Sequence, residues 1–488
     1  MSQENTSASV GSTPATTSSL SVADVCEAFW KIEREENLYD WEVLGVKLWP
    51  LVRFRIFYNL TKTAGVYAWK TTSTFTLPEG YPEHKGKLGY KAFWQSVTGW
   101  RWHLRKVIPA AWKDPRVAQW HGATDLIAPF SNRNADGIDR FMQPVIDALG
   151  DQALRLGVGS YDRKREWPHI DNLQNVFRKK YFIPATLYVR FKLAKADYEK
   201  YKRVIDFLEG VTGASAGPYR NFPRWVLRFF LSEKRGYKIL FGRLKFKRLF
   251  IVNASRMIFM AQAQAAGIKV IELQCGVFSK YNMQFSWPGR PEIPYIPNEI
   301  WTWGSYWTEG IENAGGQQIV VAGATDEFEA VRQSAVAKKP NSVSVMSQPL
   351  IGKDLFEATV KLAKLLPTHT FIFKPHPKDD LSEFTAGLPS NLSMAATDST
   401  SLGLLAESEI TVGVFSASLI EAAGLGNRVA ILKLSGWEHL TPLIAGGYAA
   451  AFETVEEMAA GFEKLPAPGD PYFFYGKRVP LQQLLAER

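Results

Sequence analysis

One segment of this chain combines a cation, an imidazole and a stiff backbone. The predicted strand 368–373 (THTFIF) runs directly into Lys374-Pro375-His376-Pro377. The two prolines restrict the backbone and supply no N–H group, so this loop is rigid. Lys374 and His376 held there could neutralise a diphosphate, and His376 could also donate a proton to a leaving phosphate. A structural turn with a surface histidine is the alternative.

A second candidate segment, Ser416-Ala417-Ser418, follows the predicted strand 409–415 and precedes LIEAAGLG. Ser416 or Ser418 would cap the next helix, whose free N–H groups and positive dipole end favour a phosphate. Glu421, one turn further, could bind a ribose diol. We expect this segment and the Lys374–Pro377 loop to follow neighbouring strands of one sheet.

The first half of the chain offers weaker candidates. The predicted strand KVIEL ends in Gln274-Cys275-Gly276, where Gln274 could bind a sugar or phosphate and Gly276 permits close backbone approach. Cys275 has no evident partner base and is a poor nucleophile candidate. The polar run 132–137 places Asp136 beside Arg133, which suggests a general base next to a group that contacts acceptor or phosphate. An ordinary Asp-Gly turn is the alternative.

Alternating strands and helices must position these residues. The expected strands are 125–130, 249–253, 269–273, 299–303 and 319–322, then 342–346, 370–373, 410–412 and 428–432. Helices are expected near 354–366, 401–407 and 417–425. This alternation predicts parallel sheets covered on both faces, with ligands beyond the carboxyl ends of the strands. No GxGxxG follows a strand and no GxxxxGK[ST] occurs, so nicotinamide and P-loop sites are disfavoured.

The chain of 488 residues divides into five predicted regions. They are a disordered tail (1–21), a helical aromatic-rich region (22–120), a first Rossmann-like domain with a basic helical insertion (121–330), a second Rossmann-like domain (331–470), and a C-terminal tail or helix (471–488). The fold class is therefore α/β.

Charge and composition limit the partners. The net charge is +10, yet residues 178–248 alone hold 19 Lys and Arg against 5 Asp and Glu. Such a zone attracts nucleic acid, an anionic membrane or an anionic substrate, unless it is only a set of solvated helix faces. The basic and aromatic run 87–114 suits a membrane interface or a core. No recognisable nucleic-acid module accompanies the charge, so we expect no nucleic acid partner.

The rest of the composition points to a reducing compartment. Cys26 and Cys275 are the two cysteines and lie far apart, which excludes a disulfide framework and a CxxC site. No run of about 18 apolar residues and no signal peptide are evident. We expect a cytoplasmic protein, peripheral on the inner membrane face.

The C-terminal motifs resemble those of GT-B glycosyltransferases that build bacterial capsules and surface polysaccharides. The similarity extends to bacterial polysialyltransferases and Kdo transferases, and more distantly to CDP-glycerol glycerophosphotransferases. Lys374–Pro377 matches the HP motif that holds the nucleotide phosphate, and Ser416 with Ser418 matches the serine motif. Glu421–Gly426 is similar to the family's E-A-x-x-L-G segment.

The N-terminal motifs are similar with two departures. Glu272–Gly276 is similar to E-L-Q-H-G, and Phe285–Pro288 to the Y-S-Y-P that follows it. Cys275 stands where relatives carry histidine, and the acidic motif of polysialyltransferases is reduced to Ala135-Asp136-Gly137. These departures move the expected base from position 275 to Asp136.

The resemblance implies two Rossmann-like domains facing a central cleft and an inverting, metal-independent glycosyltransferase. Its substrate would be a CMP-, CDP- or UDP-linked sugar, with no cofactor, and its acceptor a glycan or a lipid-linked glycan at the inner leaflet. The phosphate would be held by Lys374, His376, Ser416 and Ser418, with help from Gln274 and Gly276. Glu421 would bind the ribose. Asp136 would deprotonate the acceptor. The alternatives are a CDP-alcohol-dependent polyol-phosphate transferase, a nucleotide-sugar 2-epimerase and an inactive family member.

Overall fold

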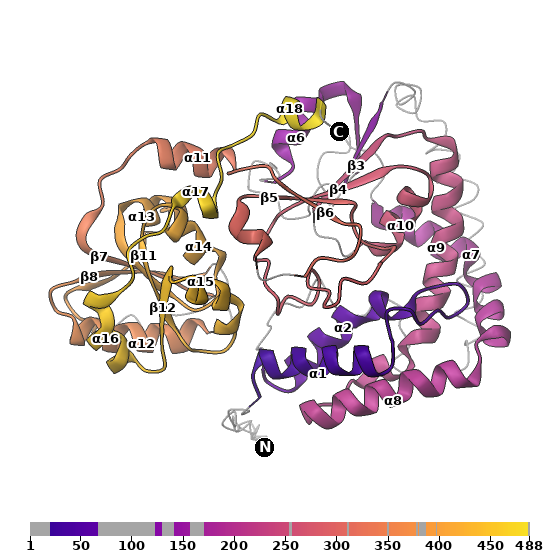
Figure 1. The fold of residues 1–488 in the computed structure, drawn as a ribbon, viewed down its shortest axis with the longest axis horizontal. Coiled ribbons are helices and arrows are strands. Elements are labelled where there is room, and N and C mark those ends of the chain that lie inside the picture. The colour runs from indigo at the N-terminus through magenta and orange to yellow at the C-terminus, as the bar shows by residue number, and fades with distance from the viewer. Residues whose placement is uncertain are drawn as a thin grey trace, which may run out of the picture.

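The computed structural model describes residues 20–66, 123–128, 141–156, 170–252, 256–309, 312–348, 351–376, 379, 387–396 and 398–486. Two lobes are visible, with residues 339–461 forming the left one (Figure 1). The predictions for residues 1–19, for the whole run 87–114 and for the Arg133–Asp136 loop lie outside the described residues, as do the rest of 67–122 and residues 129–140.

The first domain is built on a six-stranded parallel sheet. Its strands are β1 (Asp125–Ala128), β2 (Ala153–Arg155), β3 (Arg248–Val252), β4 (Lys269–Leu273), β5 (Glu299–Thr302) and β6 (Gln318–Val321), in the order β2-β1-β3-β4-β5-β6. Successive residues point to opposite faces: Leu249 packs with α10 (Met257–Ala265), and Phe250 packs with α6 (Gln143–Leu149). Both faces are therefore apolar and covered, as a parallel sheet requires.

The second domain repeats this architecture. Its strands are β7 (Lys339–Met346), β8 (Thr370–Lys374), β9 (Leu392–Met394), β10 (Ser408–Gly413), β11 (Arg428–Leu432) and β12 (Ala449–Phe452), all parallel. The main covering helices are α12 (Gly352–Leu365), α13 (Ser401–Glu407), α14 (Ala417–Gly424) and α16 (Val455–Gly461). The predicted α/β class with two Rossmann-like domains is confirmed.

The strand order corrects one prediction from the sequence. The second sheet runs β12-β11-β10-β7-β8-β9, so β7 separates β8 from β10. The Lys374–Pro377 loop and the Ser416 segment thus do not follow neighbouring strands. The reason is the doubly wound topology, in which the chain returns after β9 to the free side of the first strand. The reversal point lies between β7 and β10.

Three short strands were not expected from the sequence. β2 and β9 have three residues each, and β12 is the alanine-rich AAAF. Runs this short give little periodic signal, and alanine is depleted in strands. Pairing with β1, β8 and β11, respectively, forms them as edge strands.

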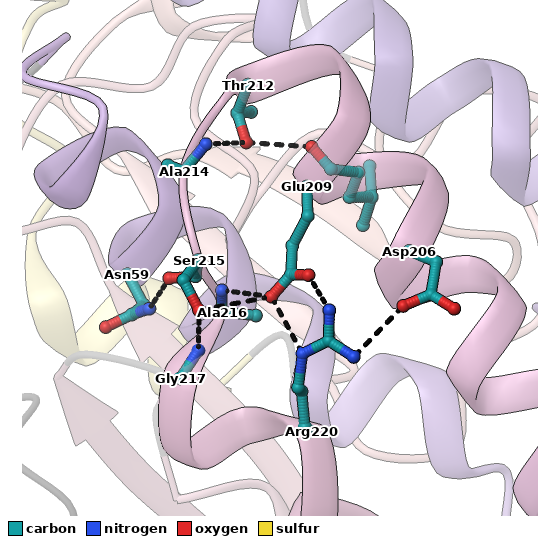
Figure 2. A network of polar contacts seen from close by, with 10 residues as sticks. Asn59, Asp206, Glu209, Thr212, Ala214, Ser215, Ala216, Gly217 and Arg220 are labelled. Carbon is teal, nitrogen blue, oxygen red and sulfur yellow. Dashed lines mark hydrogen bonds and ion pairs between the residues drawn. The ribbon is translucent and has the colours of Figure 1, made fainter.

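The N-terminal helices belong to the core of the first domain. α1 (Val22–Glu35) and α2 (Leu48–Thr63) share one apolar cluster with α8 (Lys195–Thr212) and α9 (Phe222–Arg243). The turn after α8 is held to α2: Glu209 accepts hydrogen bonds from Ala216 N–H and from Arg220, and Asn59 Nδ2 donates to Ser215 O (Figure 2). The predicted helical extension is thus packed on the domain.

The chain crosses between the domains at two places. It leaves the first domain through β6 and α11 (Asp326–Gln333), and returns through α17 (Pro471–Phe474) to α18 (Leu481–Ala486), beside α6 (Figure 1). The two crossings touch: Gly323 has φ +90°, and a Cβ there would lie 2.3 Å from Lys477 O. In the described part of the chain, no helix has the length and apolar character needed to cross a membrane.

Candidate nucleotide and acceptor site

Loops from the carboxyl ends of the two sheets meet each other. Ser279, in the loop after β4, and His439, in the 3-10 helix Trp437–Leu440 after β11, are joined by a bond of 2.8 Å between Oγ and Nδ1. The reversal points of strand order, between β1 and β3 and between β7 and β10, lie at these same edges. Ligands of open parallel sheets bind at such points.

The serine segment forms the start of α14 at the second reversal point. Ser416 is the N-cap, and its Oγ accepts from Ser418 N–H at 3.2 Å. Phe415 N–H donates to Gln348 Oε1 at 3.1 Å, which fastens the turn to the segment after β7. Glu421 lies one turn further, with 8% of its surface exposed. The structure therefore brings Ser416, Ser418 and Glu421 together on α14 beside the end of β7.

A protein carboxylate occupies the corresponding place at α12, the helix after the first strand of this sheet. Asp379 Oδ2 accepts from Ser347 Oγ at 2.6 Å and from His376 N–H at 2.8 Å. A Cβ on Gly352, the first residue of α12, would lie 2.7 Å from this carboxylate. A negative charge is favoured at a helix N-terminus, so Asp379 is well placed at the start of α12, whereas the start of α14 is capped by Ser416.

His376 and Lys374 have different surroundings. His376 is half-buried. Its backbone N–H donates to Asp379, and this hydrogen bond fixes the turn that bears the imidazole ring. Lys374 Nζ donates to Ser399 O at 2.5 Å and to Ser399 Oγ at 3.3 Å, at the turn before α13. The amine of Lys374 is therefore already hydrogen-bonded within the protein, and a phosphate would have to replace these bonds.

Gln274 and Gly276 lie at the edge of the first sheet. Gln274 is buried, its Oε1 accepts from Trp303 N–H at 2.9 Å, and its Nε2 donates to Gly276 O at 3.0 Å. Its side chain therefore ties the end of β4 to the end of β5. A Cβ on Gly276 would meet nothing within 4 Å, so the space beside this backbone is open. Cys275 is half-buried against the apolar core of the sheet.

Sequence reasoning missed His439. Burial lowers its pKa to about 4, so the imidazole is neutral at pH 7. Its ring centroid lies 6.0 Å from that of Phe415, the residue before the Ser416 cap. His439 is 160 residues from Ser279 in sequence and belongs to no motif, so no local signal could have revealed this pair.

Sequence reasoning also missed how the N-terminal helices hold the loop after Gly276. Arg53 on α2 pairs with Glu33 on α1 at 2.6 Å and donates to Met283 O at 2.7 Å and Ser286 O at 2.8 Å. Its guanidinium lies 4.5 Å from the Trp287 ring centroid. This buried pair fixes part of the segment that matches Y-S-Y-P.

Among the described residues there is no group of three or more His, Cys, Asp or Glu arranged to hold a metal ion.

Comparison with known proteins finds likeness at the level of the fold. No family model matches the sequence, and no curated relative matches. Solved structures that resemble the chain include MurG from Acinetobacter baumannii (12% identity, 70% of this chain and 90% of that one, TM-score 0.39). UDP-GlcNAc 2-epimerase from Neisseria meningitidis bound to UDP-GlcNAc matches at 13% identity over 74% and 100%, with TM-score 0.39. The spinosyn rhamnosyltransferase SpnG matches at 14% identity over 72% and 92%, also with TM-score 0.39.

Proposed function

We propose that this chain is an inverting, metal-independent glycosyltransferase that transfers a sugar from a nucleotide-sugar donor to a surface polysaccharide or lipid-linked glycan. The observation that carries the proposal is the serine-capped start of α14 at the reversal point of the second sheet. It combines hydroxyl groups, helix N–H groups and a buried carboxylate one turn away. That set suits a phosphate joined to a ribose.

The donor would bind to the second domain. Ser416, Ser418 and the helix N-terminus would hold its phosphate, with Glu421 near the ribose. His376 follows β8, on the opposite side of β7 from α14, and would stabilise or protonate the leaving phosphate. Lys374 would also contact the phosphate once its hydrogen bonds to Ser399 were broken. Positive groups placed where charge develops make a divalent cation unnecessary.

The acceptor would react from the first domain. Its hydroxyl oxygen forms a bond to the anomeric carbon on the face opposite the phosphate, the bond from that carbon to the phosphate oxygen breaks, and Asp136 takes the hydroxyl proton. The open space beside Gly276 supports a ligand at this edge. Arg133 would contact the acceptor or the phosphate.

An anionic membrane surface is the proposed site of the acceptor. α7 (Ile170–Lys192) exposes four large apolar side chains, and basic side chains such as Arg190 and Lys192 are exposed beside them. The four are Ile183 (42% exposed), Leu187 (48%), Tyr188 (47%) and Phe191 (76%). Positions 183, 187 and 191 recur every four residues and thus share one helix face. An apolar stripe with flanking cations is the composition of interfacial helices.

Two assays test the proposal. A thermal-shift screen with CMP, CDP, UDP and GDP should find one nucleotide that stabilises the protein by about 2.7 kcal/mol at 100 times its dissociation constant. With the matching nucleotide sugar, turnover should require an acceptor and survive EDTA. Failure of all four nucleotides to stabilise the protein would contradict the proposal, and loss of turnover in EDTA with rescue by Mg²⁺ would contradict metal independence. Product formed without acceptor would identify a 2-epimerase, and turnover of a CDP-alcohol would identify a polyol-phosphate transferase.

A further inference from the structure

A pocket of about 750 Å³ lies where strands β5 and β6 of the first sheet begin, at the edge opposite the candidate site. Asn298 and Gln317, which directly precede these two strands, line it. Residues of α9, of α10 and of the segment 42–47 before α2 line it as well. Pockets that bind small molecules have volumes of about 300–1,000 Å³. We call this pocket the amino-edge pocket.

One wall of the amino-edge pocket is the loop 292–298, which is held in place by other elements. Tyr295 Oη accepts a hydrogen bond from Lys47 N–H at 2.9 Å, which ties the loop to the start of α2. Gln264 Nε2 on α10 donates to Ile296 O at 2.6 Å. The wall is therefore formed before any ligand binds, so binding would cost little ordering of this loop.

Gln262 on α10 is the group in this pocket that indicates a ligand. It lines the pocket, and only 7% of the residue is exposed. Within the described part of the chain, its side-chain amide makes no hydrogen bond. A primary amide offers two N–H donors and a carbonyl acceptor, and such a group is normally hydrogen-bonded when it is buried. A polar ligand in the amino-edge pocket would supply the missing partners.

The charges around the amino-edge pocket balance each other. Lys47 and Lys234 line the pocket, and so do Glu42 and Glu292. The described lining therefore carries no net charge, in contrast to the basic zone 178–248 as a whole. Without a net positive field, this pocket favours an uncharged ligand over an anion.

We propose that the amino-edge pocket binds an uncharged carbohydrate, at a site separate from the donor and the acceptor. A sugar carries hydroxyl groups, which both donate and accept hydrogen bonds, on a ring with apolar C–H faces. The Gln262 amide matches the hydroxyl groups, and the lining side chains of Phe230 and Tyr295 match the apolar faces. In the proposed transferase, a glycan held here would stay near the enzyme between transfers, which raises its effective concentration. That role rests on the proposed function, whereas the binding site itself does not.

The test is a titration of the full chain, followed by saturation-transfer NMR, with two uncharged trisaccharides, maltotriose and triacetylchitotriose. Trigalacturonate is the acidic comparison. Gln262→Leu replaces the amide by an apolar group of similar size. Ala265→Trp fills the pocket from the exposed last residue of α10, and Ala266→Trp is the matched control, since Ala266 is the next residue, also exposed and outside the lining.

At least one uncharged trisaccharide should bind, and it should bind more tightly than trigalacturonate. Gln262→Leu should weaken this binding about three- to tenfold, because it removes the hydrogen bonds of the amide. Ala265→Trp should weaken it about tenfold or more by occupying the space, and Ala266→Trp should have no effect. If Gln262→Leu lowers the melting temperature, the surface variant Ala265→Trp decides the outcome alone.

Binding of neither uncharged trisaccharide, or a preference for trigalacturonate, would overturn this inference. Binding that Ala265→Trp leaves unchanged would also overturn it, because the sugar would then lie elsewhere on the protein. So would unchanged binding in a stably folded Gln262→Leu variant. Nucleotides should stabilise all three variants as they do the wild type, since α14 belongs to the other domain. The thermal-shift screen therefore tests the proposed function separately from this site.

Discussion

At the scale of single residues, the two serines at the start of α14 have different structural roles. Ser416 is the N-cap of α14, so Ser416→Ala should lower the free energy of unfolding by about 1 kcal/mol. A loss of binding in this variant could therefore come from the loss of the cap alone. Ser418 contributes its backbone N–H to that cap and leaves its hydroxyl outside it. Ser418 is therefore the cleaner position for testing phosphate binding.

We expect Ser418→Ala and His376→Ala each to weaken nucleotide binding by about 1.5–3 kcal/mol, the cost of one charge-assisted hydrogen bond. Neither should lower the melting temperature much, because the Ser416 cap and the Asp379 backbone bond remain. Calorimetry with the nucleotide found in the screen measures the effect. Ser390→Ala, an exposed serine just before β9, is the control, and unchanged affinity in both test variants would refute the donor site.

Asp136→Asn should lower turnover about 10²–10⁴-fold with little change in nucleotide affinity, because it removes the base and keeps the side chain's shape. Steady-state assays with saturating donor measure this. Asp151→Asn, an exposed carboxylate in the 3-10 helix after α6, should be neutral. If Asp136→Asn keeps more than about a tenth of the turnover, the base is another group.

At the scale of elements, α7 is apolar on two faces. Ala185 and Val189 are buried in the domain, whereas the stripe containing Leu187 and Phe191 is exposed. A helix packed on one side only usually presents polar residues outward. Contact with a membrane surface would explain why this stripe of α7 is apolar although it is exposed.

The double change Leu187→Ser and Phe191→Ser should reduce sedimentation with anionic vesicles while leaving nucleotide affinity unchanged. Reversing charge at Lys179, Lys180, Lys245 and Lys247 should reduce it too, since each cation near an anionic surface contributes about 1 kcal/mol. Binding should be largely lost near about 1 M salt and weak on neutral lipid. Val336→Ser with Leu365→Ser, exposed apolar residues of the second domain, are the control. Equal binding to anionic and neutral vesicles would contradict the membrane proposal.

At the scale of the whole molecule, the bond between Ser279 and His439 joins the two domains near the proposed site. A second bond, from Ser435 Oγ to Val66 O at 2.5 Å, joins the same loop of the second domain to the end of α2. Both contacts involve loops at the carboxyl edges of the sheets. The loop after β11 therefore contacts the first domain through two hydrogen bonds.

Stability should fall in acid because of His439. Its pKa is about 4 in the folded protein and about 6.5 when unfolded, so the unfolded state binds a proton first as the pH falls. The free energy of unfolding should drop by about 3 kcal/mol between pH 6.5 and 4 from this residue alone. Urea unfolding of wild type and His439→Asn across this range should show a shallower pH dependence in the variant. Parallel curves would show that His439 does not titrate in this way.

The amino-acid sequence by itself determined the features that depend on near neighbours. Apolar runs and turn residues predicted the central strands of both sheets, and the position of Ser416 before a helical pattern predicted the N-cap of α14. Both features depend on residues only a few positions apart in the sequence. The edge strands β2, β9 and β12 were not predicted, because their runs of three or four residues are too short to show a periodic pattern.

Only the tertiary structure decided which distant segments meet. It placed β7 between β8 and β10, put Asp379 at the start of α12, and joined Ser279 to His439. It also packed α2, α7 and α10 against α9. Such pairings are set by the winding order of each sheet and by how its helices pack, and no local pattern of residue types encodes them. The sequence therefore supports a hypothesis for the chemistry of each candidate residue, whereas the partners of the described ones became visible only in the folded structure.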